Sequence, residues 1–502
     1  MFSLPSDVDV KKLLEQVHPA VEALKHRWTV ALDAYDGEGG FIGGGYLWRF
    51  PREVDAEFKH RQTQARYHNY AATLVDYYVR KVMGGEITRE TTSEPLRAFW
   101  ANVDGAGTNI NEWLKAALAK ALAAGHVGIL ADKTTDAPTG PAVADEKAAV
   151  YLTRYLPTAI LDWRETRDAT LTAVKLAEDV PQGDLLAEPA ADDQSRLVLL
   201  WDTDEWVRVS PGEHGSSVER QSHTLGMVPL VVLRPFHHAR WAFVGRTLLE
   251  PSVLVALYNR ASEQDEVLRN QSFSVFVVGL PGTGEVDVEK AKQALGNEVG
   301  SLRALFTYGS GSYETPSQEI PRVLEEHQAF LIRELYRMAH LPFDQDTRQV
   351  ESGEAIRLKH EALSGVLAGV SQELERVELA IARAFFAWTS PTPETALAAY
   401  EAAQVSVKYP RDYFDADPEL EMKTLVAAVD AVDSPTFDKY VQKQIVSKFS
   451  GGLDAATLET IKQEIDAAEA PAPVTDAAGL RAGAEARLAQ AMAAQDEPEA
   501  AA

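Results

Sequence analysis

The spacing of apolar and polar residues divides the chain into stretches of different period. Apolar residues recur at helical spacing from Arg61 to Val82 and from Asn109 to Ala124, and the second stretch starts at a capping asparagine. Between residues 127 and 245 the pattern becomes short apolar runs separated by turn residues, which is typical of strands. Helical spacing returns at residues 249–270. The pattern predicts an α+β fold that is mainly α.

The longest predicted helix runs from about Glu354 to Trp388. Its apolar residues follow one another in steps of three or four: Leu363, Leu367, Val370, Leu374, Val377, Ile381, Phe385 and Trp388. Such a helix would be ~50 Å long at about 1.5 Å per residue, whereas helices in globular proteins average about 11–12 residues. This length is typical of an elongated subunit or a structural spine.

Composition narrows the possible functions. The chain has 502 residues, no cysteine and a formal net charge of -26. Without cysteine it can form no disulfide, thiolate metal site or cysteine nucleophile. The acidic balance argues against tight wrapping of nucleic acid, because that affinity comes from neutralised phosphates, but it does not exclude nucleic acid passing through. No run approaches the ~18 apolar residues of a membrane helix, so we expect no membrane partner.

Catalytic motifs are missing from the sequence. It contains no His-Glu-x-x-His pair, no glycine-rich loop completed by Lys-Ser/Thr and no Gly-x-Ser-x-Gly elbow. The glycine-rich stretch at residues 37–45 therefore predicts a mobile surface loop. Composition and spacing thus show no catalytic constellation, and we expect no catalytic residue, no cofactor and no metal site.

The order of predicted parts resembles the portal proteins of tailed bacteriophages. In that family a helix descends into a small α/β clip, a second helix returns, and a tunnel loop leads into a long kinked helix. The most specific local match is Ser352-Gly-Glu-Ala-Ile-Arg-Leu-Lys-His-Glu-Ala-Leu-Ser364, which is similar to the start of the long helix in portals. The stretches 68–81 and 226–231 are similar to the family's wing.

The resemblance implies a division of the chain into named parts. They are a wing (1–248), a descending stem helix (249–274), a clip (275–320), a returning stem helix (321–341), a tunnel loop (342–353), a long wing helix (354–390), a helical crown (391–468) and a flexible Ala/Glu-rich tail (469–502). These parts would be strung along one axis in an elongated subunit.

The resemblance also implies a function without catalytic activity of its own, so the protein would not be an enzyme. Portals form a ring, usually of twelve subunits, at one capsid vertex of the virion. Double-stranded DNA enters and leaves through this ring during packaging and ejection. The implied partners are the terminase large subunit, the major capsid and scaffolding proteins and a head-completion or tail adaptor. The protein would be found in the virion, and in the host cytoplasm during assembly.

Two sets of residues are implied to contact the DNA. The stem helices carry candidates for basic rings, namely Arg260, Arg269, Arg333 and Arg337. The tunnel loop carries candidates for a constriction, namely Asp344, Gln345, Asp346, Arg348 and Gln349. For any single arginine, a salt bridge on the helix surface or between subunits is the simpler explanation.

Two alternative functions remain open at the level of sequence. An intracellular enzyme could hold a pocket in the 127–245 sheet region, with His126, Asp162, Trp163 and His223 as candidates. Another virion component, such as an adaptor or scaffold, is a second alternative. Proteins of that kind are usually shorter or nearly all helical, and the strand region speaks against them.

Overall fold

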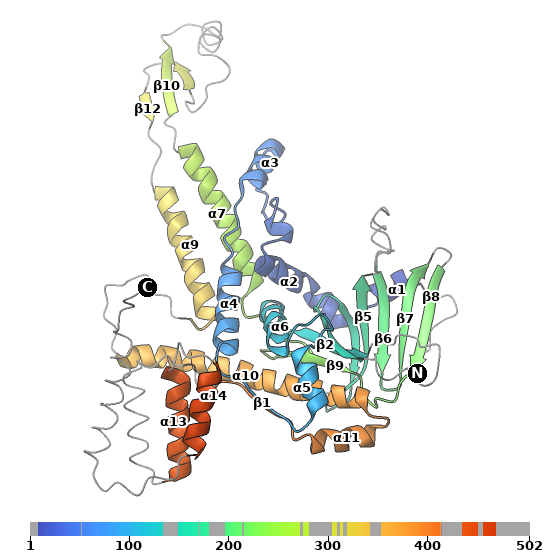
Figure 1. Cartoon of the computed structure of the whole chain (residues 1–502). Helices are drawn as coiled ribbons and strands as arrows, with labels where there is room; N and C mark the ends of the chain where they lie inside the picture. The colour runs from blue at the N-terminus through green and yellow to red at the C-terminus, as the bar shows by residue number, and fades with distance from the viewer. Residues whose placement is uncertain are drawn as a thin grey trace, which may run out of the picture. The chain divides into compact units, whose positions relative to one another are not determined.

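The computed structural model describes residues 9–51, 53–133, 149–168, 170–179, 196–212, 215–271, 275–280, 304–308, 312–314, 319–341, 353–411, 413, 434–449 and 455–467 (Figure 1). The chain forms two compact units, residues 1–413 and residues 414–502. Helices predominate and sheets are present, which confirms the predicted α+β, mainly α class.

The helices of the first unit are α1 (Val10–Glu15), α2 (Pro19–Asp36), the 3-10 turn η1 (Gly39–Phe41), α3 (Asp55–Gln64), α4 (Tyr70–Met83), α5 (Glu94–Ala101), α6 (Ile110–Ala124), α7 (Pro251–Gln271), α9 (Glu319–Met338), α10 (Gly353–Thr389) and α11 (Pro393–Ala402). Its strands are β1 (Thr88–Glu90), β2 (Val127–Lys133), β3 (Val150–Tyr155), β4 (Ile160–Glu165), β5 (Leu171–Asp179), β6 (Arg196–Asp202), β7 (Glu205–Gly212), β8 (Gly215–Ser222), β9 (Leu230–Leu233), β10 (Val275–Leu280), β11 (Ala304–Tyr308), β12 (Ser312–Glu314) and β13 (Ser406–Lys408). The second unit contains α13 (Pro435–Phe449) and α14 (Ala455–Ala467), which pack against each other.

The helix predicted from Arg61 to Val82 is in fact two helices, α3 and α4. Ala65 adopts extended backbone angles after α3, so the first helix stops there. Asn69 then caps α4, because its Oδ1 accepts a hydrogen bond from the N–H of Ala72 at 2.8 Å. Its amide also donates to the carbonyl of Tyr35 at 2.9 Å. The apolar residues keep their helical spacing from α3 into α4, so the spacing alone did not reveal the break. The break is specified by the capping side chain of Asn69.

Strands β4 to β8 form an antiparallel meander in sequence order, and β2 lies between β3 and β9 in a second antiparallel sheet. The central strand β6 is apolar on both faces because both are covered. Val198 and Leu200 pack with α1 on one side, and Leu199 and Trp201 belong to the larger core on the other. Strand β8 carries mostly exposed polar residues and so gave no apolar signal in the sequence.

Helix α10 runs through the core of the first unit. The predicted stripe is confirmed, since Leu363, Leu367 and the following apolar positions to Phe385 are all buried. The helix packs against α4, β2, β9, β13 and α11. Near its end, the Trp388 indole N–H donates to the carbonyl of Ala131 in β2 at 2.8 Å. Helix α10 therefore connects elements that precede it in the chain, such as α4 and β2, to α11 and β13, which follow it.

A buried ion pair crosses the α10 core. Arg89 in β1 donates Nε and Nη2 to the two carboxylate oxygens of Glu378, both at 2.6 Å, and the Glu378 side chain is fully buried. The Tyr409 hydroxyl also donates to Glu378. Burial and the neighbouring carboxylate raise the pKa of Tyr409, which keeps this donor protonated. The network fixes the antiparallel pair β1–β13 against α10.

We predict that Glu378→Ala lowers the free energy of unfolding by about 3–5 kcal/mol, because it leaves the Arg89 guanidinium buried without its counter-charge. Tyr409→Phe removes the hydrogen bond to Glu378 and a longer one, of 3.4 Å, that the hydroxyl accepts from Arg89, and should cost about 1–2 kcal/mol. Urea denaturation followed by circular dichroism measures both. The exposed pair Arg322–Glu326 supplies the control, since Arg322→Ala should change stability by no more than about 1 kcal/mol.

The double variant Arg89→Met/Glu378→Leu separates the loss of a charge partner from the loss of packing. It removes both charges and should recover most of the stability that Glu378→Ala loses. Equal losses in the single and double variants would contradict this account of the pair.

Candidate functional site

The predicted DNA-contacting arginines lie on a pair of helices joined through a small sheet. The chain passes from α7 through β10, β11 and β12 into α9, and α7 packs against α9 (Figure 1). In the sheet, β10 is central, parallel to β11 and antiparallel to β12. The stretch therefore has a helix–sheet–helix order.

The contact between α7 and α9 is apolar with one polar bridge. Leu257 of α7 is buried, as are Leu331 and Leu335 of α9, and all three belong to one core cluster. Between them the Gln328 amide of α9 donates to the Arg260 carbonyl of α7 at 3.2 Å and to the Gln264 side chain. This bridge links the antiparallel pair at the level of Arg260.

Two side chains tie the helix pair to the rest of the unit. Asn259 of α7 is fully buried, and its Oδ1 accepts from the N–H of Trp48 at 2.6 Å while its amide donates to the Tyr46 carbonyl at 2.9 Å. Tyr78 of α4 donates its hydroxyl to the Ala339 carbonyl at 2.6 Å, just after α9 ends. Both ends of the pair near the core are therefore fixed by buried hydrogen bonds.

The two predicted arginines of α7 are engaged with neighbours. Arg260 forms an ion pair with Glu263 on its own helix, and its guanidinium lies 5.9 Å from the ring centre of Trp48. Arg269 pairs with Glu266 at 3.2 Å and contacts His60 Nε2 of α3 at 2.7 Å. Each is half-buried and helps to hold α7 against the segment that leads into α3.

The two predicted arginines of α9 differ from each other. Arg337 donates Nε and Nη2 to one oxygen of Glu334, at 2.9 and 2.7 Å, and this contact lowers the pKa of the Glu334 carboxyl. Arg333 is exposed and has no ion-pair partner among the residues that the structure describes. Three of the four arginines thus form salt bridges within their own helices, and Arg333 is the exception.

The predicted constriction lies outside the described residues. This applies to Asp344, Gln345, Asp346, Arg348 and Gln349.

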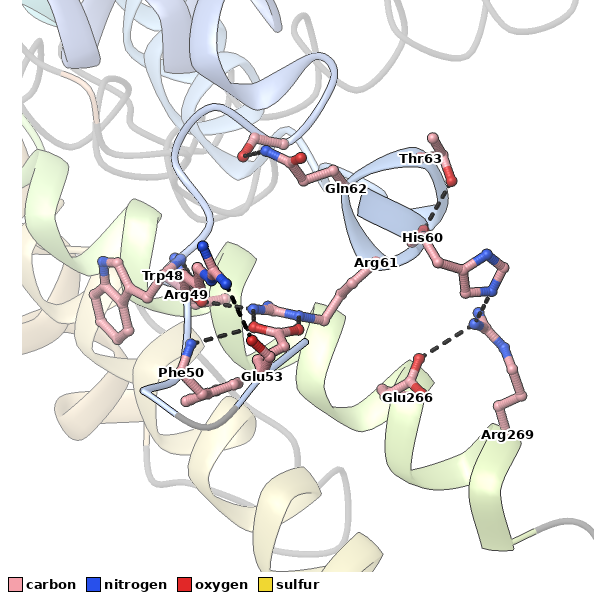
Figure 2. A network of polar contacts seen from close by, with 12 residues as sticks. Trp48, Arg49, Phe50, Glu53, His60, Arg61, Gln62, Thr63, Glu266 and Arg269 are labelled. Atoms are coloured by element: carbon pink, nitrogen blue, oxygen red, sulfur yellow. Dashed lines mark hydrogen bonds and ion pairs between the residues drawn. The ribbon is translucent and has the colours of Figure 1, made fainter. Parts of the chain in front are cut away.

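A buried arginine beside the helix pair was missed by the sequence analysis. Arg61 of α3 is only 3% exposed, and it pairs with Glu53 through two contacts of 2.8 and 2.9 Å. It also donates to the Trp48 carbonyl and lies 5.0 Å from the ring centre of Phe50 (Figure 2). The signal in the sequence was the alternation of aromatic and basic residues at positions 48–52.

A cleft of about 490 Å³ lies between the end of α9, α10 and the segment after β9. Its charged lining residues are Arg234, His237, Arg246, His340, Glu373 and Arg376. Glu373 pairs with Arg376 at 2.7 Å and accepts from the backbone N–H of Arg234 at 3.0 Å, so these groups hold β9 against α10. None of the four enzyme candidates lines this cleft.

Two of the enzyme candidates, His126 and Trp163, are core residues. His126 is fully buried, and neither ring nitrogen has a partner among the described residues. Burial, with a smaller contribution from the charge of Arg234, lowers the pKa of His126 to about 3. Trp163 stacks between His18 and Phe243, with ring centres 3.9 and 4.5 Å away. A neutral, enclosed imidazole cannot exchange protons with a substrate.

The other two candidates, Asp162 and His223, also have structural roles. Asp162 accepts from the N–H of Trp163 at 2.9 Å, and His223 Nδ1 accepts from the N–H of Leu225 at 3.4 Å. Burial lowers the pKa of His223, whose ring lies 5.4 Å from that of Trp201. Over the described ranges, no three acidic or histidine side chains gather as metal ligands.

A bilayer-crossing helix is likewise not found in the part of the chain that the structure describes, because no helix there is both long and apolar enough.

Comparisons with known proteins found no matching family model and no matching curated protein. Among solved structures, the chain is similar to one from the virion of a native gene transfer agent particle, at 13% identity and a TM-score of 0.39, over 82% of this chain and 98% of that one. It is similar to a chain from the neck of the empty particle computed with C6 symmetry, at 12% identity and a TM-score of 0.36, over 78% of this chain and 89% of that one. It is also similar to a chain from the neck of the native particle computed with C12 symmetry, at 13% identity and a TM-score of 0.37, over 80% of this chain and 95% of that one.

We predict that His126 makes stability depend on pH. Its pKa is about 3 in the folded chain and ~6.5 when unfolded, so the unfolded state binds the extra proton between these values. Stability is therefore complete above pH ~6.5 and falls as the pH drops below it, by about 1.4 kcal/mol at pH ~5.5. Urea unfolding at pH ~8 and at pH ~5.5 measures the total loss, and His126→Leu should remove the share that His126 contributes, whereas the share of His223 remains.

The exposed His26 of α2 supplies the control for this titration. His26→Gln should keep the full pH dependence of the unmodified chain. If His126→Leu also kept it, the imidazole would be reached by protons in the folded state, and the description of His126 as a sealed core residue would be wrong.

Proposed function

We propose that this chain is the portal subunit of a tailed bacteriophage, forming a ring at one capsid vertex through which double-stranded DNA is packaged and ejected. The observation that carries the proposal is the order α7, three-stranded sheet, α9, then the 37-residue α10. This is the order of stem, clip, stem and long helix in portals. Under this proposal the chain acts by shape and assembly, without catalysing a reaction.

The burial of α10 supports a structural role. A helix of 37 residues that buries one stripe against five other elements gives a rigid frame. The enzyme candidates His126, Asp162 and His223 are committed to the core or to backbone hydrogen bonds. These placements favour the portal over the alternative of an enzyme with a pocket in that sheet.

The charge balance also supports a conduit. About 6–10 phosphate contacts bind DNA tightly and with strong salt dependence, which would stop its movement. A chain with net charge -26 repels phosphates, and salt bridges on α7 and α9 neutralise most of the candidate arginines. A single uncompensated guanidinium per subunit would guide the polymer without holding it. Arg333 is the residue that fits this role.

The proposed partners follow from the portal role. The ring, usually of twelve copies, would dock the terminase large subunit during packaging and a head-completion or tail adaptor afterwards. It would assemble with the major capsid and scaffolding proteins. We place the protein in the virion, and in the host cytoplasm before assembly.

The first test is the assembly itself. Purified full-length chain should form rings with a central hole in negative-stain images, because each copy must bury surface against two neighbours. Light scattering measures the mass of the same sample. A chain that stays monomeric at every concentration would contradict the portal proposal, and association with a capsid vertex without a ring would favour an adaptor.

The second test concerns Arg333. Arg333→Gln should leave ring formation and the free energy of unfolding unchanged, because the side chain is exposed and unpaired within the described residues. It should reduce the amount of DNA retained per particle, measured by nuclease protection after packaging. Arg337→Gln on the same helix is the matched control, since Glu334 already compensates that charge. Equal effects of the two variants would remove Arg333 from the channel.

A further inference from the structure

An exposed apolar surface stands beside α7. It consists of Trp48, Phe50 and Val54, which are 45%, 42% and 61% exposed, and we call it the aromatic patch. Large apolar side chains grouped on a surface mark interaction sites more often than isolated ones do. Trp and Arg are the residues that contribute most at protein interfaces, and this patch holds Trp48 next to Arg49.

The aromatic patch is held in place before any partner binds. Arg61 pairs with Glu53 and donates to the Trp48 carbonyl, while Glu53 accepts from the N–H of Phe50 at 3.2 Å (Figure 2). The Trp48 N–H is bonded to the buried Asn259 of α7. A surface fixed in this way loses little conformational entropy when it binds.

A second exposed apolar surface lies on α9. Ile320, Val323 and Phe330 are 53%, 61% and 48% exposed, and their spacing of three and seven puts them on one face. We call them the α9 stripe. Leu331 and Leu335, which pack toward α7, occupy a neighbouring face of the same helix. The stripe is therefore not used in the contact between α9 and α7.

The two surfaces belong to different sides of the helix pair. Helix α7 packs against α9 and also against α3, and in Figure 1 these two helices lie on opposite sides of α7. The aromatic patch lies in the segment that leads into α3, and the α9 stripe lies on α9. We propose that the aromatic patch of one copy receives the α9 stripe of a second copy, an inference that rests on the proposed ring and names the surfaces that close it.

Charge complementarity selects this occupant. Residues 42–66 carry five bases (Arg49, Arg52, Lys59, Arg61, Arg66) against three acids (Glu53, Asp55, Glu57), a net charge of +2 in a chain of -26. Residues 319–330 of α9 carry three acids (Glu319, Glu325, Glu326) against one base (Arg322), a net charge of -2. The segment that carries the aromatic patch is thus locally positive, and the segment that carries the α9 stripe is locally negative.

The pairing is heterologous, because two different surfaces meet. Contacts of this kind repeat from copy to copy and close into a ring when the rotation allows it. The same contact would place the stem helices of neighbouring copies side by side. The interface therefore involves the segment of the subunit that the portal proposal assigns to the channel wall.

The absence of cysteine makes the contact testable by cross-linking. Val54→Cys and Val323→Cys change two valines of equal exposure, and no native thiol can interfere. The double variant, treated with a short bis-maleimide, should give a ladder of covalent oligomers on a denaturing gel. A mixture of the two single variants should give covalent dimers only, because each copy then has one reactive surface. Neither single variant alone should cross-link.

The control pairs Val54→Cys with Leu397→Cys, which is on α11 and 57% exposed, and should not cross-link. Negative-stain images of the same samples separate two failures. Rings without a 54–323 cross-link would overturn the assigned surfaces while the portal proposal stands. Monomers without cross-links would overturn both. Cross-linking of the Val54→Cys variant with itself would show a two-fold contact and overturn the head-to-tail pairing.

Discussion

The fold of the first unit depends on the need to bury one apolar stripe along the whole of α10. A helix of 37 residues exposes a stripe far longer than any single neighbour can cover. Elements from both halves of the chain are therefore drawn to it: α4 and β2 from before the helix pair, and α11 and β13 from after it. This burial is non-directional, so it brings the elements together without specifying how they align. Their alignment must come from polar contacts.

Carboxylates on α10 supply that alignment. Glu378 meets Arg89 of β1 and Tyr409, and Glu373 meets the backbone of Arg234 after β9. Each would be costly to bury alone, so only the arrangement that pairs them is stable. The helix pair α7 and α9 follows the same rule, since Asn259 and Tyr78 bind specific backbone groups at its base. Apolar burial thus provides most of the stability, and a few buried polar contacts set the geometry.

The sequence predicted the elements whose signal is local. The stripe of α10, the cap of α6 and the helix predicted at residues 249–270 were evident because periodicity and capping depend on residues close together. It did not predict β8, whose polar residues lack a buried face, or the break before α4, which a single asparagine sets. The Arg61–Glu53 pair connects the last turn of α3 to the residues just before this helix, and the contacts of Arg260 and Arg269 join segments distant in sequence. Spacing alone contains no information about such contacts.

The hydrogen bond from Tyr78 to the Ala339 carbonyl has a mechanical consequence. It attaches the end of α9 directly to α4, at the point where the backbone of His340 turns to a positive φ of 52°. Force applied along α9 would therefore pass into the core through this hydrogen bond as well as through the buried side chains of Leu331 and Leu335. Tyr78 lies in the same buried cluster as the α10 stripe, so the load would spread over many packed side chains. The helix pair is thus fixed at the end where α9 meets α4. Its displacement under load would be largest at the opposite end, where α7 ends and α9 begins.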